Sequence, residues 1–349
     1  MLQFKLSRPT KAADLLVFCR ESSFACLPTK VACGGRRGTA SSGCKNSYPL
    51  RAQASDRSNA IGAHSMVWVG GWSEEEMRLA IDGAKSIGYD LVEVATLNPR
   101  QFLEAADRTR RAFQEADLQI ANSLGLPPDC DVNSEDRESV RRGTEILLDA
   151  VKVADAMGSR YVGGILYGSL QKYGRPTSTE ARANAVRAVR EAAGAAADRG
   201  ITLGMEVVNR YESNLVNTAA QAMDFISDVG ADNVVVHLDT YHMNIEEMST
   251  AAAVRTCGDR LGYVHIGESH RGYLGTGSVD FKGLFEALVQ ADYRGPITFE
   301  SFSTRVLHPD LSNTLAIWRD MWEDSDDLAA HAKAFIDAHL AAARNAHRA

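Results

Sequence analysis

Four residues of metal-binding type stand at the ends of apolar runs in the second half of the sequence. They are Glu206 in LGMEVV, Asp239 in VVVHLD, His265 in GYVHI and Glu300 in PITFE. A single strand-end Asp is often a helix cap and a single buried His is often a core residue, but four at successive strand ends favour one shared site. Three carboxylates and one imidazole form an oxygen-rich donor set, which suits Mn²⁺, Mg²⁺ or Co²⁺ better than a metal that prefers thiolates.

Two of these carboxylates could also transfer protons. If the four runs are strands five to eight of a closed eight-stranded ring, Glu206 and Glu300 approach its centre from directions about 135° apart. A sugar between them would meet one carboxylate on each face. This arrangement fits epimerisation, in which one base removes the proton beside a carbonyl and the opposite acid returns it to the other face of a planar enediolate. A cation on the substrate oxygens would stabilise the developing negative charge.

Three further polar residues follow these strand ends closely. Glu212 comes six residues after Glu206, His242 three after Asp239, and Arg271 six after His265. Each falls in a loop that would open on the same end of the ring. These side chains could hold sugar hydroxyls or the enediolate oxygen. Taken one at a time, each is equally well interpreted as a solvated loop residue.

The elements that must position these residues alternate regularly from Ile61 onward. Short β-rich runs alternate with longer amphipathic, Ala-rich runs, which is typical of repeated βαβ units. We expect helical segments near 74–87, 100–116, 135–157, 178–199, 218–229, 250–257 and 281–291, with a closing helical region over 312–345. The predicted strands are 62–68, 90–95, 118–124, 160–165, 201–208, 233–239, 261–266 and 296–300.

Eight such units predict a single α/β domain over residues 56–349, a (β/α)8 TIM barrel. The length after the leader is a little above the ~250 residues that are typical of one barrel. An open doubly wound sheet is disfavoured because its first turn should carry a glycine-rich dinucleotide motif. Here the turn reads VGGWSEEE at 69–76, and its three acidic residues would repel a pyrophosphate.

The first 55 residues differ in composition from the rest. They hold nine basic and two acidic residues, and four of the six cysteines. An acid-poor leader of this kind predicts a plastid transit peptide and a chloroplast location, with a mitochondrial or cytoplasmic location as alternatives. The remainder carries 29 basic and 43 acidic residues, a formal charge of −14, which argues against nucleic-acid binding. No apolar run approaches the roughly 18 residues that span a bilayer, so we expect no membrane role.

Four longer motifs resemble those of the ketose 3-epimerases, a family of xylose isomerase-like barrels. They are MEVVNRYESN (205–214), HLDTYHMNIEE (237–247), VHIGESHRGYLGTG (264–277) and TFESFS (298–303), and the likeness spans roughly residues 61–340. The family comprises D-tagatose, D-allulose (D-psicose) and L-ribulose 3-epimerases. GESHR at 267–271 and FESF at 299–302 are closer to the L-ribulose branch.

The resemblance implies a free ketose as substrate and a metal-dependent epimerase as the activity. It implies Mn²⁺ or a similar ion on Glu206, Asp239, His265 and Glu300, with Glu206 and Glu300 as the acid–base pair. It also implies that Glu212, His242 and Arg271 contact the substrate near its carbonyl end. The expected assembly is a homodimer or homotetramer. The expected sugar pairs are D-tagatose and D-sorbose, D-fructose and D-allulose, and L-ribulose and L-xylulose.

Two other functions remain open at this point. An aldose–ketose or hydroxypyruvate-type isomerase could use the same metal but move the proton between adjacent carbons. A non-catalytic sugar-binding protein is disfavoured by the intact set of four ligand types. A sugar phosphate is less favoured than a free sugar, because the loop that contains GTG at 275–277 has no lysine.

Overall fold

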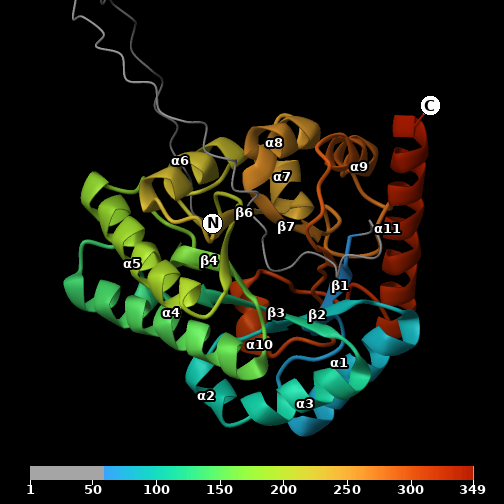
Figure 1. Ribbon diagram of the computed structural model, residues 1–349, viewed down its shortest axis with the longest axis horizontal. Helices are drawn as coiled ribbons and strands as arrows, with labels where there is room; N and C mark the ends of the chain where they lie inside the picture. Colours follow the sequence, from blue (N-terminus) through green and yellow to red (C-terminus); the bar gives the residue numbers. More distant parts are fainter. Residues whose placement is uncertain (1–58, 349) are drawn as a thin grey trace, which may run out of the picture. The chain divides into compact units, whose positions relative to one another are not determined.

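The computed structural model describes residues 59–348 and shows eight parallel strands that close into a barrel (Figure 1). Each strand pairs with the next along the chain, and β1 also pairs with β8. This confirms the predicted (β/α)8 fold, whereas the predicted leader over 1–55 lies outside the described residues. The strands are β1 Ile61–His64, β2 Leu91–Ala95, β3 Gln119–Leu126, β4 Tyr161–Ser169, β5 Thr202–Glu206, β6 Val234–Asp239, β7 Leu261–Ile266 and β8 Ile297–Phe299.

Helices surround the barrel, and several begin at side chains that cap their first turn. Ser73 and Glu76 form a reciprocal capping box before α1, and Thr218 and Gln221 do the same before α6. Figure 1 shows α4 and α5 side by side, with α11 along the opposite flank. The helices are α1 Glu74–Ile87, α2 Pro99–Leu103, α3 Ala106–Ala116, α4 Arg137–Met157, α5 Thr179–Ala197, α6 Ala219–Val229, α7 Thr240–Glu246, α8 Thr250–Cys257, α9 Phe281–Gln290, α10 Pro309–Thr314 and α11 Ser325–Arg348.

The element boundaries differ from the prediction in several places. The predicted helix over 100–116 is divided into α2 and α3, and the first strand ends at His64, before a 3-10 turn over Ser65–Val67. The closing region is also two helices. Ala316 has a φ of 55°, a left-handed conformation that ends α10, and Asp324 then accepts hydrogen bonds from the backbone of Asp326 and Asp327 at the start of α11.

The barrel interior changes from apolar to polar along the strands. Near their starts lie stacked Tyr161 and Tyr263, with ring centroids 4.3 Å apart, packed with Leu91 and Val235. A Cβ at Gly204 would overlap the Tyr161 hydroxyl, so this glycine makes room for the ring. Two residues further along β2, β6 and β7, the side chains become polar: Glu93, His237 and His265.

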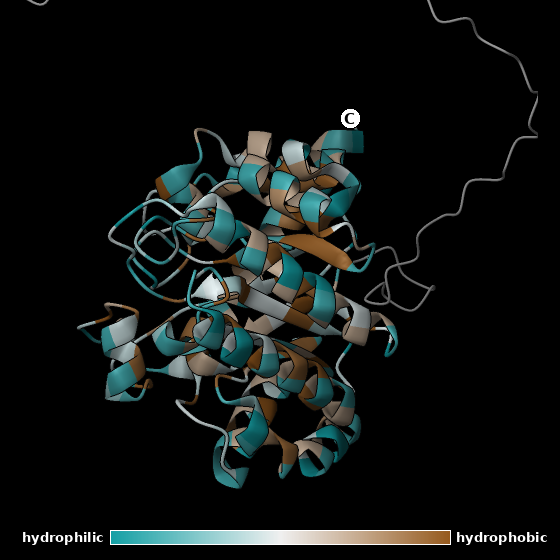
Figure 2. Ribbon diagram, turned by 90° about the vertical axis from the view of Figure 1, so that its left-hand side faces the viewer, coloured by the Kyte–Doolittle hydropathy of each residue, from teal (hydrophilic) through white to brown (hydrophobic). Residues whose placement is uncertain are grey.

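Hydrophobic residues gather on the strands and on the helix faces that cover them, while the outer helix faces are largely hydrophilic (Figure 2). Buried aliphatic side chains of α1, α4, α5, α6 and α9 pack around the barrel in one continuous core. Within residues 59–348, no helix has both the length and the apolar character needed to cross a bilayer. The core therefore holds the strand ends rigidly, and the site described next is built on those ends.

Candidate metal and substrate site

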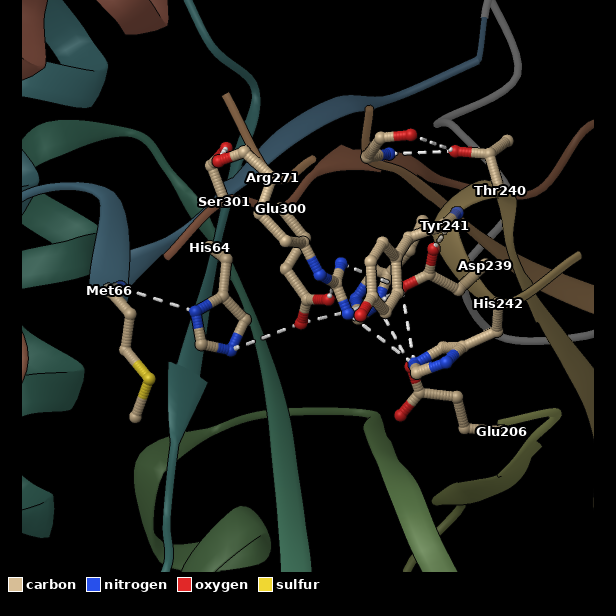
Figure 3. A network of polar contacts seen from close by, with 12 residues as sticks. His64, Met66, Glu206, Asp239, Thr240, Tyr241, His242, Arg271, Glu300 and Ser301 are labelled. Carbon is tan, nitrogen blue, oxygen red and sulfur yellow. Dashed lines mark hydrogen bonds and ion pairs between the residues drawn. The ribbon is translucent and has the colours of Figure 1, made fainter. Parts of the chain in front are cut away.

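The four predicted metal ligands lie together at the carboxyl end of the barrel. Glu206 ends β5, Asp239 ends β6, His265 lies in β7, and Glu300 directly follows β8. All four are buried, and one donor atom of each lies within 4.8 Å of the others. The register of neighbouring strands brings them together, because Asp239 is the direct partner of His265 across β6 and β7. Figure 3 shows Glu206, Asp239 and Glu300 converging on this region.

His265 is oriented as a metal ligand would be. Its Nε2–H group donates to Oε2 of Glu93 at 2.8 Å, so Nδ1 is turned toward the carboxylates. Nδ1 lies 3.3 Å from Oε1 of Glu206 and 3.4 Å from Oε1 of Glu300, yet this buried atom has no hydrogen-bond partner. A histidine held by a carboxylate on one nitrogen, with the other nitrogen free, is the usual arrangement around bound metal ions. The donor set therefore fits a divalent cation.

The negative charge of the site also favours a cation. Burial lowers the pKa of His265, but the carboxylates of Glu300 and Glu93 outweigh this and raise it well above its usual range. Burial raises the pKa of Glu300 well above its usual range, and neighbouring Asp239 and Glu206 add to this effect. Burial likewise disfavours the ionised form of Asp239, but the Arg271 guanidinium holds its pKa well below the usual range. Negative charge that holds a proton so strongly would also hold a metal ion.

Arg271 is a buried cation fixed above the carboxylates. Its Nη1 donates to Oε2 of Glu300 at 2.7 Å and to Oδ2 of Asp239 at 3.1 Å. The guanidinium carbon lies 3.8 Å from the ring centroid of Tyr241 and 4.9 Å from that of Phe302. Arg271 has a φ of 62°, a rare conformation for a side chain of this size. This cation therefore balances part of the negative charge of the carboxylate cluster.

The other two predicted substrate residues form a connected pair with Asn209. His242 accepts a hydrogen bond at Nδ1 from the backbone N–H of Asn209 at 3.1 Å, and the Asn209 side chain donates to Oε1 of Glu212 at 2.8 Å. The other nitrogen of His242 lies 3.4 Å from Nη2 of Arg271. The structure therefore brings the three predicted substrate residues to one side of the carboxylate cluster, and their roles remain predictions.

These residues share one cavity with a largely apolar surface from elsewhere in the chain. Glu206, Glu212, His242, His265, Arg271 and Glu300 line it, whereas Asp239 is buried behind them. The apolar lining comes mostly from the first four strands and their loops and from the α10 region, with one residue after β5 and one after β8. It consists of Met66, Ala95, Leu97, Leu124, Ile165, Leu170, Val208, Phe302, Leu311 and Leu315. A small organic molecule in this cavity would have polar groups at one end and apolar contacts at the other.

Sequence reasoning missed two polar residues that approach the ligands from the first half of the barrel. Glu93 lies in the run DLVEVA and His64 in GAHSM, so both showed the signal that identified the ligands, a polar residue inside an apolar strand. His64 Nε2 lies 4.0 Å from Oε1 of Glu300 and 3.8 Å from Oε1 of Glu93. Burial lowers the pKa of His64 to about 4, so its imidazole is neutral at pH 7. Glu93 and His64 therefore border the cluster from the first half of the barrel.

Comparison with known proteins agrees with this geometry. Residues 81–338 match the family described as "Xylose isomerase-like TIM barrel". The chain is 52% identical to an L-ribulose 3-epimerase of Methylomonas sp. (strain DH-1), over 79% of this chain and 96% of that one. It is 44% identical to a ketose 3-epimerase of Arthrobacter globiformis, over 81% of this chain and 97% of that one.

A solved structure extends the likeness to three dimensions. A D-allulose 3-epimerase from Methylomonas sp. superposes with a TM-score of 0.80 at 49% identity, covering 84% of this chain and all of that one. These matches confirm the predicted family and the predicted class of enzyme. The chain belongs to the xylose isomerase-like TIM barrel family and, within it, to the ketose 3-epimerases, which are carbohydrate epimerases.

Proposed function

We propose that this enzyme inverts carbon 3 of free ketoses, using Glu206 and Glu300 as the acid–base pair. One observation carries the proposal. Glu206 and Glu300 arise from different strands, yet both place a carboxylate oxygen within 3.4 Å of the same atom, Nδ1 of His265, at the floor of one cavity. Two carboxylates that share a small site from different directions can serve opposite faces of a planar intermediate.

The side chains divide the reaction between them. One of the two glutamates would take the proton from carbon 3, and the other would return a proton to the opposite face of the enediolate. Arg271, fixed against Tyr241, would donate to the oxygen that becomes negative. A divalent cation held by Glu206, Asp239, His265 and Glu300 would supply Lewis-acid activation of the carbonyl and adjacent hydroxyl oxygens. The donor set favours Mn²⁺, with Mg²⁺ or Co²⁺ as alternatives.

The substrate is proposed to be a free ketopentose or ketohexose. Two similar proteins are named L-ribulose 3-epimerase and D-allulose 3-epimerase, which supports L-ribulose with L-xylulose, and D-fructose with D-allulose, as the first pairs to test. D-tagatose with D-sorbose is the third pair. Arg271 is the arginine that lines the cavity in the described part of the chain, and Glu300 and Asp239 already balance its charge through contacts with Nη1. This favours an uncharged sugar over a sugar phosphate.

The reaction can be tested by isotope exchange in heavy water. The purified full-length chain, stripped with chelator and reloaded with Mn²⁺, is incubated with L-ribulose, D-fructose or D-tagatose in D₂O. We expect chelator-sensitive inversion at carbon 3 with deuterium at that carbon, detected by NMR. Formation of an aldose would identify an isomerase instead. Absence of inversion on all three sugars would refute the proposal.

The proposal for the N-terminal segment is separate from that for catalysis. We propose that residues 1–55 direct the protein to plastids, because their excess of basic residues opposes the acidic remainder. A fusion of residues 1–55 to a fluorescent protein should enter chloroplasts. Mitochondrial or diffuse fluorescence would contradict it. The proposed homodimer or homotetramer can be distinguished from a monomer by light scattering.

A further inference from the structure

His237 is a buried histidine that the proposed reaction does not use. It lies on β6, two residues before Asp239, and pairs directly with Glu206 across β5 and β6. Its side chain is 0% exposed, and within the described chain neither ring nitrogen has a hydrogen-bond partner. An unpartnered buried polar group destabilises the folded protein. An imidazole left in this state in the barrel interior requires an explanation.

The neighbours of His237 restrict what could satisfy its nitrogens. The rings of Tyr161 and Tyr263 lie beside it, with centroids 6.1 Å and 4.8 Å away, and make edge contacts. The ring of His265 lies edge-on with its centroid at 4.1 Å. One donor atom each of Glu206, His237 and His265 lies within 4.8 Å of the others. The three side chains are therefore close enough to share one small ligand.

We propose that Glu206, His237 and His265 form a second cation site that takes Zn²⁺ or a similar nitrogen-preferring metal. One carboxylate and two imidazoles, with one position open, is a donor set found in four-coordinate zinc sites. The set that includes Asp239 and Glu300 has only one nitrogen and suits Mn²⁺ or Mg²⁺. Glu206 and His265 belong to both sets. The barrel therefore offers two overlapping sites that sort metals by their preferred donors, and one ion at a time can occupy them.

The overlap has a consequence that rests on the proposed function. A zinc ion held by His237 would draw Glu206 and His265 away from the oxygen-rich set. Glu206 and His265 would then already be bound to zinc, so Mn²⁺ could not bind at the oxygen-rich set. We therefore expect Zn²⁺ to inhibit the Mn²⁺ enzyme competitively with respect to Mn²⁺.

The binding site can be tested without any measurement of activity. The full-length chain is stripped of metal and loaded with one equivalent of Zn²⁺, and X-ray absorption at the zinc edge counts the imidazole ligands. We expect two imidazoles in the natural protein and one in His237→Asn. The Zn²⁺ affinity of His237→Asn should fall at least about tenfold, because loss of a ligand costs no less than loss of a residue that orients one. Its Mn²⁺ affinity should change less than about threefold.

Two further variants make the test decisive. Tyr161→Phe removes another buried, unpartnered oxygen beside His237 but no member of the donor set, and it should retain two imidazoles. His237→Phe preserves an aromatic ring among the tyrosines and replaces His237→Asn if that variant does not fold. A single imidazole in the natural protein would overturn the proposal, as would equal losses of Zn²⁺ and Mn²⁺ affinity in the variant. Because these are binding measurements, failure of the proposed epimerase activity would not affect them.

Discussion

The two halves of the barrel contribute different chemistry to the same cavity. β5 to β8 supply all four predicted metal ligands, and the loops that follow them supply Glu212, His242 and Arg271. β1 to β4 and their loops supply mostly apolar lining, such as Leu97, Leu124 and Ile165. The polar exceptions in this lining are His64 and Ser123. Glu93 lies outside the lining and contacts the second half through His265. The second half thus provides most of the ionisable side chains. The first half provides most of the apolar surface and the carboxylate that orients His265.

This division predicts how the effects of substitutions should be graded. Removal of a proton-transfer group from the second half should abolish chemistry. Removal of the Glu93 carboxylate, which supports His265 from the first half, should weaken cation binding but leave the proton-transfer groups in place. Changes to the apolar lining should alter substrate preference with little effect on turnover. The experiments below test this order, beginning with the largest expected effect.

The largest effect is expected when either proton-transfer group becomes an amide. Glu206→Gln and Glu300→Gln should each lower kcat by about 10²–10⁴-fold, because an amide can neither take nor give the proton at carbon 3. Steady-state assays with saturating Mn²⁺ measure the loss. Glu191→Gln, the same change on the exposed side of α5, is the control and should retain full activity. Nearly normal turnover in both active-site variants would remove the acid–base role from this half of the barrel.

A smaller effect is expected at Glu93, where the two halves meet. Glu93→Gln keeps the size of the side chain but removes its charge. That charge orients His265 and leaves Nδ1 as the nitrogen that can bind a metal ion. We expect Mn²⁺ affinity to fall about 10–100-fold, as is typical of residues that orient a metal ligand. Isothermal titration with Mn²⁺ measures the affinity. Excess Mn²⁺ should restore most of kcat, and a loss of kcat that persists at saturation would place Glu93 in the chemistry itself.

A loss smaller than that at Glu93 is expected when Arg271 becomes lysine. Arg271→Lys keeps the positive charge but loses the planar stack on Tyr241 and the Nη1 group that contacts both Asp239 and Glu300. We expect kcat/KM to fall about tenfold, equivalent to about 1.4 kcal/mol of transition-state stabilisation. Arg210→Lys tests the same change at an exposed arginine that pairs with Glu246 outside the carboxylate cluster, and it should have little effect. Equal losses in the two variants would indicate a general effect of the substitution.

The sequence predicted the ligands because each strand end is recognisable without its neighbours. Glu206, Asp239 and Glu300 interrupt or end apolar runs, and the closed ring then brings such ends together. The partner of His265 was not predictable in this way, since Glu93 is 172 residues away and meets it across the barrel interior. Glu93 is recognisable as a polar residue inside the apolar run DLVEVA, but its contact with His265 depends on how the barrel closes.

Local backbone geometry accounts for most other differences. The helix α7 was missed because Asp239 was assigned to metal binding alone, whereas its Oδ1 also accepts from the backbone of Tyr241 at 2.6 Å and caps that helix. Arg271 has a positive φ, which residue spacing does not reveal. The end of α10 likewise depends on the left-handed Ala316. Residue types indicated the chemistry of the site, but they did not indicate these backbone conformations.

The smallest effect is expected from the apolar lining of the first half, and Leu97 is suited to measure it. Leu97 is 40% exposed at the cavity, so Leu97→Ala should leave the fold and the Mn²⁺ affinity unchanged. A lost contact of this size costs about 1 kcal/mol or less for a half-exposed side chain, so KM should rise less than about fivefold at constant kcat. The cost should be larger for D-fructose than for L-ribulose, because the longer sugar has more atoms to place beyond the polar end. The ratio of kcat/KM for these two sugars, measured on both proteins, is therefore the relevant quantity. An unchanged ratio would mean that Leu97 does not contact the distal end of the sugar, and a lower kcat would show that the first half also takes part in the chemistry.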